Sequence, residues 1–200
     1  INSYLTPPFT QAFSSGTFPP TLWTKLSGVL GNPSTPSTTT SGWAEDDWRN
    51  VTSPLNKCTK LNIYGTTVNY WLVTPTIQLG DGSIDYQLKF NLALTKWDAT
   101  TTPDVNGTDD KFAVIISTDN GTTWSSANTL RLWDNASSPN IYNNISFDGE
   151  IVTISLAAYS GDVKIGFYGE STVSNADNDL FVDNVEVRQI PSASNTQTVT

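Results

Sequence analysis

Apolar and polar residues alternate along most of the chain. The clearest example is SIDYQLKFNLAL (83–94), where apolar side chains from Ile84 to Leu94 fill every second position and polar ones, up to Asn91, fill most of the rest. Successive side chains of a strand point to opposite faces of its sheet. The segment therefore predicts a strand of about ten residues with one side in water.

Several further segments are typical of strands, and no apolar stripe with helical spacing separates them. KFAVIIS (111–117) is apolar on both faces, which predicts a strand inside a sheet. Glycine-containing turns, such as Asn106-Gly107 and Asn120-Gly121, lie between the strands. The fold class predicted is all-β, an antiparallel β-sandwich of the jelly-roll type. The other strand-like segments are NYWLVTPTIQL (69–79), EIVTISL (150–156), DVKIGFYG (162–169) and DLFVDNVEVRQ (179–189).

The pattern indicates one domain over residues 1–189. Two segments are low in complexity, GNPSTPSTTTSG (31–42) and IPSASNTQTVT (190–200). The first is expected to form a loop between strands, and the second a linker or tail towards a further domain.

STDNGTTW (117–124) fits the pattern often called an Asp-box, which recurs in sialidase propellers. Asp119 is placed to accept hydrogen bonds from turn amides, Gly121 to adopt a positive φ, and Trp124 to cover the hairpin. The chain has one copy, and its three arginines lie far apart in sequence. The motif therefore predicts a stabilised turn, without sialidase chemistry.

Composition and charge exclude several classes of function. The formal net charge is −9 over 200 residues, and the basic residues are scattered, which disfavours binding to nucleic acid or to an anionic membrane. The chain has no His and one Cys, so it lacks His-based catalytic triads, His-ligated zinc and an internal disulfide. No apolar run is long enough to predict a membrane-spanning helix.

Five phrases, in order, resemble one family. They are FTQAFSSGTFPPTLWTKLSG (9–28), NYWLVTPTIQL (69–79), TDDKFAVIISTDNGTTW (108–124), ISLAAYSGDVKIGFYGES (154–171) and DNDLFVDNVEV (177–187). Together they are similar to the cleaved-adhesin or "choice-of-anchor J" domains, which are MAM-like jelly rolls. The resemblance implies a secreted or cell-surface protein of Bacteroidetes-type bacteria, with peptidase or glycan-active domains as neighbours in the same polypeptide.

The same resemblance implies a structural calcium ion where the first strand meets the last. Asp183 matches the family's terminal acidic residue, whereas Gln11 stands where the family usually has Glu; Asp179 is a further candidate ligand. A regular strand would place Asp183 on the same face as Phe181 and Val185, and a buried carboxylate without a partner is costly. The alternative is a carboxylate held by backbone amides, or turned outward by a β-bulge.

Other acidic residues are weaker candidates. DVNGTDD (104–110) gathers carboxylates around a glycine turn but lacks the complete EF-hand pattern, so a solvated acidic loop is favoured over a calcium site. EDDW (45–48) is likewise expected to be a wet loop. Glu170 is the best single candidate for acid–base catalysis, but a surface charge at a strand end is the favoured interpretation.

Trp43, Trp48, Trp97 and Trp133 lie in or near polar segments and are the candidates for stacking on a sugar ring. For each of them, packing in the core or a turn is the alternative. The predicted function is a non-catalytic accessory or adhesin module that binds a polysaccharide or glycoprotein and is stabilised by calcium. The alternatives are a ligand-free domain packed on a neighbouring enzyme domain, and a carboxylate-dependent hydrolase.

Overall fold

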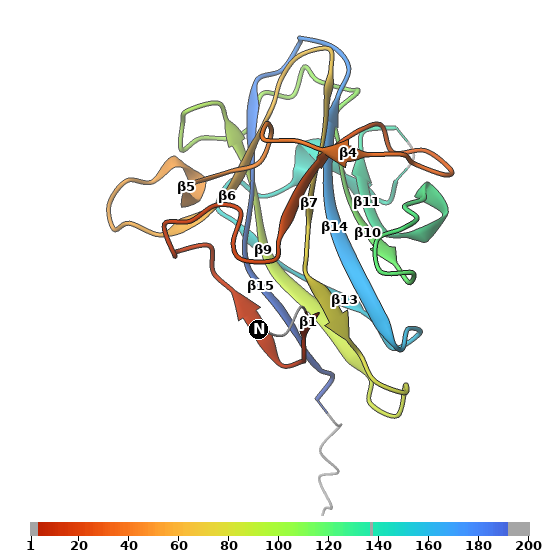
Figure 1. Cartoon of the computed structure of the whole chain (residues 1–200). Coiled ribbons are helices and arrows are strands. Elements are labelled where there is room, and N and C mark those ends of the chain that lie inside the picture. Colours follow the sequence, from red (N-terminus) through yellow and green to blue (C-terminus); the bar gives the residue numbers. More distant parts are fainter. Residues whose placement is uncertain (1–3, 137, 192–200) are drawn as a thin grey trace, which may run out of the picture.

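Two β-sheets pack face to face in the computed structural model, which describes residues 4–136 and 138–191 (Figure 1). No α-helix occurs within these ranges, and no helix there is suited to crossing a membrane. The predicted antiparallel β-sandwich is confirmed. The helical turns are three short 3₁₀ segments, η1 (Trp48–Asn50), η2 (Ser126–Asn128) and η3 (Tyr142–Asn144).

The larger sheet has nine strands. Its main path runs in the order β12 (Asn140–Ile141), β11 (Thr129–Asp134), β10 (Lys111–Ser117), β14 (Asp162–Ser171), β7 (Val68–Val73), β3 (Thr24–Ser27) and β4 (Ser37–Thr38). Two more strands extend it, β8 (Thr76–Gln78), which pairs with β14, and β1 (Tyr4–Leu5), which pairs with β8. Pairing is parallel between β1 and β8 and between β11 and β12, and antiparallel elsewhere in this sheet.

The smaller sheet has six strands, all paired antiparallel. Its order is β13 (Glu150–Ser155), β9 (Tyr86–Lys96), β15 (Asn178–Gln189), β6 (Lys57–Ile63) and β5 (Ala44–Asp47), and β2 (Phe9–Gln11) also pairs with β15. The tail predicted at 190–200 lies, from residue 192 onward, outside the described residues.

The three acidic residues of the EDDW segment belong to β5, and the prediction of a wet loop there is wrong. The strand pairs with β6, so the acidic side chains meet lysines of the neighbouring strand. Asp47 bonds to Lys57 and Asp46 to Lys60, each at 2.5 Å. The acidic run alone does not reveal that it pairs, as an edge strand, with a strand that carries these lysines.

The main core fills the space between the sheets. Alternate residues of β9 point into it, from Tyr86 through Leu88 to Leu94, as the alternating pattern predicts. Ile84 is an exception, because it precedes the strand and is 40% exposed. The strand therefore starts two residues later than the alternation suggests, after the Gly80–Gly82 turn.

A second apolar cluster covers the outer face of the nine-stranded sheet. Trp71, Trp124 and Tyr168 form its aromatic part, with ring centroids 4.7 Å apart for Trp71 and Tyr168 and 5.5 Å apart for the two tryptophans. The chain just before and within the predicted 31–42 loop lies over this cluster. Gly28 O accepts a hydrogen bond from Trp71 Nε1 at 2.7 Å, and Ser34 N donates to Trp124 O at 2.7 Å. This cover explains why β10, as predicted, is apolar on both faces.

The Asp-box turn has the predicted structural role. Asp119 Oδ2 accepts a hydrogen bond from the Thr123 hydroxyl, and Asp119 Oδ1 accepts from Ser117 Oγ at 2.7 Å and Thr123 N at 2.9 Å. These bonds, the one from the Thr123 hydroxyl most of all, lower the pKa of Asp119 to about 2. Gly121 has a φ of +82°, and Trp124 is buried in the outer aromatic cluster. The motif thus anchors the β10–β11 turn to the sheet surface.

A β-bulge in β15 changes which residues face the core. Before it, Leu180 and Val182 point into the main core; after it, Val185 and Val187 do so. The register with β9 shifts between Asp183 and Glu186, where β15 has one residue more than β9. This extra residue reverses which of the following side chains face the core. The regular strand assumed from the sequence is therefore wrong, and Asp183 shares the outer face with Phe181 but not with Val185.

Candidate functional site

Two of the four predicted sugar-stacking tryptophans are core residues. Trp43 is fully buried, donates from Nε1 to Tyr70 O at 3.3 Å and belongs to the main core. Trp133 is also buried, with its ring centroid 5.1 Å from that of Phe112. Neither has a ring face open to a ligand, so their assignment to a binding surface is wrong.

The other two tryptophans reach the surface at different places. Trp97 is 57% exposed, just beyond the end of β9, with its backbone N–H bonded to Asp177 O. Trp48 is partly exposed and lies in η1, where one side of its ring packs edge-on against Phe181 at a centroid distance of 6.1 Å. Of these two tryptophans, Trp48 lines a cavity that also contains polar side chains.

The groove beside Trp48 has a volume of about 460 Å³. Its wall is formed by η1 on one side and by β9, β13 and the turn before β13 on the other. Arg49 fixes this turn against η1, because its Nε donates to Phe147 O at 2.6 Å and its Nη2 to Asp148 Oδ1 at 2.8 Å. The lining residues are Trp48, Asn91, Asp148, Gly149, Glu150 and Ile151.

The groove combines one aromatic ring with planar polar groups. Asn91 supplies an amide, and Asp148 and Glu150 supply carboxylates that can accept hydrogen bonds from hydroxyls. Burial raises the pKa of Glu150, and the charge of Arg131 opposes the rise. An apolar wall with a few convergent polar groups is the usual composition of a small-molecule site.

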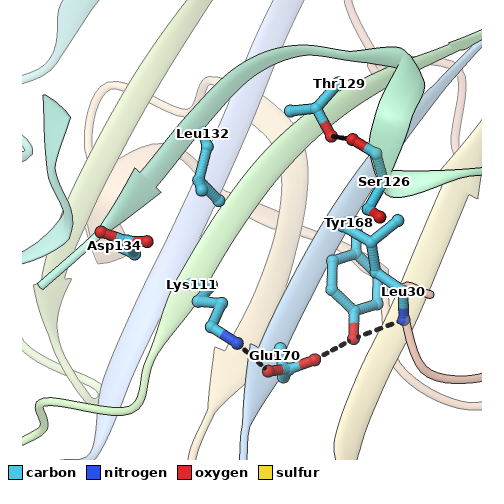
Figure 2. A pocket seen from close by; sticks show the side chains of 8 residues that line it. All are labelled: Leu30, Lys111, Ser126, Thr129, Leu132, Asp134, Tyr168 and Glu170. Atoms are coloured by element: carbon cyan, nitrogen blue, oxygen red, sulfur yellow. Dashed lines mark hydrogen bonds and ion pairs between the residues drawn. The ribbon is translucent and has the colours of Figure 1, made fainter. Parts of the chain in front are cut away.

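A second cavity, of about 310 Å³, lies on the outer face of the nine-stranded sheet (Figure 2). Glu170 is 7% exposed and sits between two donors, Lys111 Nζ at 2.6 Å and the Tyr168 hydroxyl at 2.5 Å. The Tyr168 hydroxyl in turn accepts from Leu30 N at 3.2 Å. Glu170 is thus a buried, paired carboxylate, and its interpretation as a surface charge is wrong.

The predicted calcium ligands do not converge on one point. Asp179 and Asp183 are four residues apart on β15, which corresponds to about 13 Å. Calcium binds oxygens at about 2.3–2.6 Å, so one ion cannot contact both side chains. Gln11 pairs with Val185 through β2 and so lies at the Asp183 end of the strand.

Asp179 is held entirely by donors from the protein. Its carboxylate is fully buried and accepts from Asn50 Nδ2 at 3.0 Å, Asn62 Nδ2 at 3.2 Å and Asp98 N at 2.9 Å. Lys60 Nζ lies 3.7 Å away and supplies the opposite charge. These bonds tie η1 and the turn after β9 to the outer face of the six-stranded sheet, and they fit an anchor better than a metal ligand.

Asp183 is also buried, beside the β-bulge. Asn184 N donates to its Oδ1 at 2.7 Å, and Asn56 Nδ2 and Asn184 Nδ2 donate to its Oδ2 at 3.2 and 3.1 Å. Burial raises the pKa of Asp183 to about 6, and the hydrogen bonds from Asn184 and Asn56 oppose the rise. Among the described residues, no three acidic or Cys side chains form a metal-binding group. With neutral Gln11 nearby and amide donors on both oxygens, the residues present fit a calcium ion poorly.

No family model matches the sequence, and no curated protein matches it. Solved structures do match. The K1 cleaved adhesin domain of Lys-gingipain from Porphyromonas gingivalis W83 aligns with a TM-score of 0.57 at 18% identity, over 92% of this chain and 98% of that one. The K3 cleaved adhesin domain of the same protein aligns at 0.51 and 16%, over 90% and 98%. The chain has a cleaved-adhesin-like fold.

The cleaved-adhesin-like fold also resembles TmCBM61, a carbohydrate-binding module solved in complex with β-1,4-galactotriose. That match has a TM-score of 0.51 at 14% identity and covers 95% of this chain and all of the other. The matches to the K1 and K3 domains confirm, for the fold, the likeness to cleaved-adhesin domains noted in the five sequence phrases.

Sequence reasoning found Trp48 but missed the rest of its groove. The sequence marks Asn91 only as a polar position of a strand and Asp148-Gly149 only as a turn between strands. The three segments are far apart in the chain and meet through the pairing of β13 with β9 and the contacts of Arg49. Pairing of this kind has no local signal, although the exposed apolar Ile151 in an otherwise alternating strand is an indication of an unusual surface.

Proposed function

We propose that this domain is a non-catalytic module that binds carbohydrate in the groove beside Trp48. The observation that carries the proposal is the composition of this groove: an anchored tryptophan ring next to an amide and two carboxylates. A sugar offers an apolar ring face to the aromatic side chain and hydroxyls to the planar polar groups. The fold shared with a galactotriose-binding module supports a carbohydrate as the ligand.

Titration with soluble polysaccharides, including β-1,4-galactan, tests the proposal through tryptophan fluorescence and calorimetry. Trp48→Ala is expected to weaken binding roughly tenfold or more, as for truncation of an anchoring aromatic residue. Trp97→Ala is the matched control, because Trp97 is exposed but lies outside the groove. Glu150→Gln keeps the shape of the wall and is expected to weaken binding without affecting folding.

The result would contradict the proposal if the wild-type protein bound no member of the panel, or if Trp97→Ala abolished binding while Trp48→Ala and Glu150→Gln did not. A panel with no response would favour the second candidate, a domain that packs on a neighbour in the same polypeptide. Ile151, 65% exposed at the edge of the groove, is the apolar side chain that such a contact would cover.

Secretion or surface display and calcium stabilisation belong to the same proposal. They are supported by the resemblance of the sequence to cleaved-adhesin domains and by the shared fold. Detection of the protein on the cell surface or in the culture medium tests the first of them. An unfolding midpoint that is the same with EDTA and with calcium would contradict the second.

A further inference from the structure

Asp110 is a buried carboxylate without a partner. It immediately precedes β10, is 0% exposed, and neither of its oxygens accepts a hydrogen bond. Buried polar side chains are nearly always hydrogen-bonded, and an isolated buried charge is costlier still. The segment at 104–110 is a loop with exposed residues, as the sequence favours, but Asp110 at its end is not solvated.

Only one oxygen of the adjacent carboxylate, Asp109, accepts hydrogen bonds. Asp109 Oδ2 accepts from Thr172 N at 2.6 Å and from Val173 N at 2.9 Å, whereas its Oδ1 is buried and unpaired. The Ser171 hydroxyl lies 3.3 Å from Asp109 Oδ2, and its proximity also opposes the rise in the pKa of Asp110. This hydroxyl has one proton and also faces Gly65 O at 3.0 Å, so it cannot satisfy both carboxylates.

The loop is folded closely around Asp110. A Cβ on Gly107 would lie 2.4 Å from Asp110 Oδ2 and 2.8 Å from Ala176 Cβ, so a larger residue there would have to displace both neighbours. Gly107 O is held by the Nδ2 atoms of Asn135 and Asn143 at 3.0 and 3.1 Å. Asp104 N donates to Asn178 Oδ1 at 2.7 Å, which fixes the start of the loop against β15.

None of the described basic side chains compensates these carboxylates. Among the described residues, neither Lys nor Arg forms an ion pair with Asp104, Asp109 or Asp110. Burial, with added repulsion from Asp109 and Asp104, raises the pKa of Asp110 to about 7. The Tyr142 hydroxyl is also buried and unpaired, and burial, together with the charge of Asp110, raises its pKa well above the ordinary value.

We propose that Asp109 and Asp110 bind a calcium ion between the loop at 104–110 and the turn after β14. The available ligand atoms are carboxylate oxygens, which suit a hard divalent cation. Calcium tolerates irregular geometry and completes its coordination shell with backbone carbonyls and water. The site differs from the one implied for Gln11 and Asp183. It lies at the end of the sandwich where β10 begins and β14 ends (Figure 1).

The test uses the whole chain stripped with EDTA and then titrated with calcium by calorimetry, and with terbium by luminescence. Calcium at a hundredfold excess over its dissociation constant is expected to raise the unfolding midpoint by roughly 5 to 10 °C. In Asp110→Asn the calcium affinity should fall at least tenfold. The same substitution should raise the midpoint in EDTA, because it removes a buried, uncompensated charge.

Two control variants locate the ion. Asp162→Asn makes the same charge change at an exposed position at the opposite end of β14, and it should bind calcium as the wild type does. Asp183→Asn should do the same. If Asp110→Asn does not fold, Asp109→Asn takes its place, since an amide oxygen can still accept from Thr172 and Val173.

The proposal is overturned if the wild type shows neither heat nor a change of midpoint with calcium. It is also overturned if Asp110→Asn binds calcium normally. Loss of binding in Asp183→Asn alone would place the ion at the first-strand and last-strand site instead. These outcomes are independent of sugar binding at Trp48, which belongs to a separate surface.

Discussion

Asp119 shows how one exposed side chain stabilises a turn of this domain. Its carboxylate accepts bonds from Ser117 and Thr123, and its pKa in the folded protein, about 2, lies below the ordinary value of 3.8. The contribution to stability is therefore complete above about pH 4 and is lost as the pH falls through 2. We expect Asp119→Asn to lower the free energy of unfolding by about 1 kcal/mol at pH 7.

Thermal unfolding at several pH values measures this effect. The difference between Asp119→Asn and the wild type should shrink as the pH approaches 2. Asp85→Asn, at an exposed acidic position outside any turn motif, is the matched control and should change little. An equal loss in both variants, or a difference independent of pH, would contradict the assigned role of the Asp-box.

Residue-level predictions succeeded where the cause is local. The Asp-box bonds span only a few positions, so the sequence contains them completely. The prediction that Trp43 and Trp133 stack on a sugar was wrong, because polar neighbours in the sequence say little about burial. Their contacts, with Tyr70 O and the Phe112 ring, come from strands far away in the chain. The unpaired state of Asp110 was equally hidden, since it depends on Gly107 and on the end of β14.

Within β15, the bulge at Asp183 and Asn184 sets which face the last residues present. Asn184 has a φ of +48°, a left-handed conformation that Asn and Gly tolerate better than other residues. We expect Asn184→Ala to lower the free energy of unfolding by roughly 1–2 kcal/mol, through backbone strain and loss of the side-chain bond to Asp183. Asn184→Gly should cost less, because glycine relieves the strain.

Urea unfolding compares the two variants, and the slope of the transition should be unchanged. Equal losses for alanine and glycine would show that the backbone conformation contributes nothing. The bulge was in fact visible in the sequence: the core residues change from even positions, Leu180 and Val182, to odd ones, Val185 and Val187. The apolar Phe181, which packs on the outer face, concealed the change by continuing the odd series.

At the scale of the whole molecule, the close approach of the two sheets depends on Gly169. A Cβ on this residue of β14 would lie 2.4 Å from Leu61 Cδ2 and 2.9 Å from Ile63 Cδ1, both on β6 of the opposite sheet. Most sandwiches keep their sheets about 10 Å apart, and an extra methyl group here must displace core side chains. We expect Gly169→Ala to lower the free energy of unfolding by about 1–3 kcal/mol.

A double-mutant cycle with Leu61→Ala separates this clash from any other effect of the methyl group. Leu61→Ala alone should destabilise the protein by roughly 2–5 kcal/mol, because it leaves a cavity in the main core. In that background the methyl group of Gly169→Ala enters the vacated space, so the second substitution should cost little or nothing. Strictly additive losses would mean that the sheets adjust freely at this point. A large favourable coupling would show that the spacing of the two layers is fixed by one glycine opposite one leucine, a property that neither strand reveals alone.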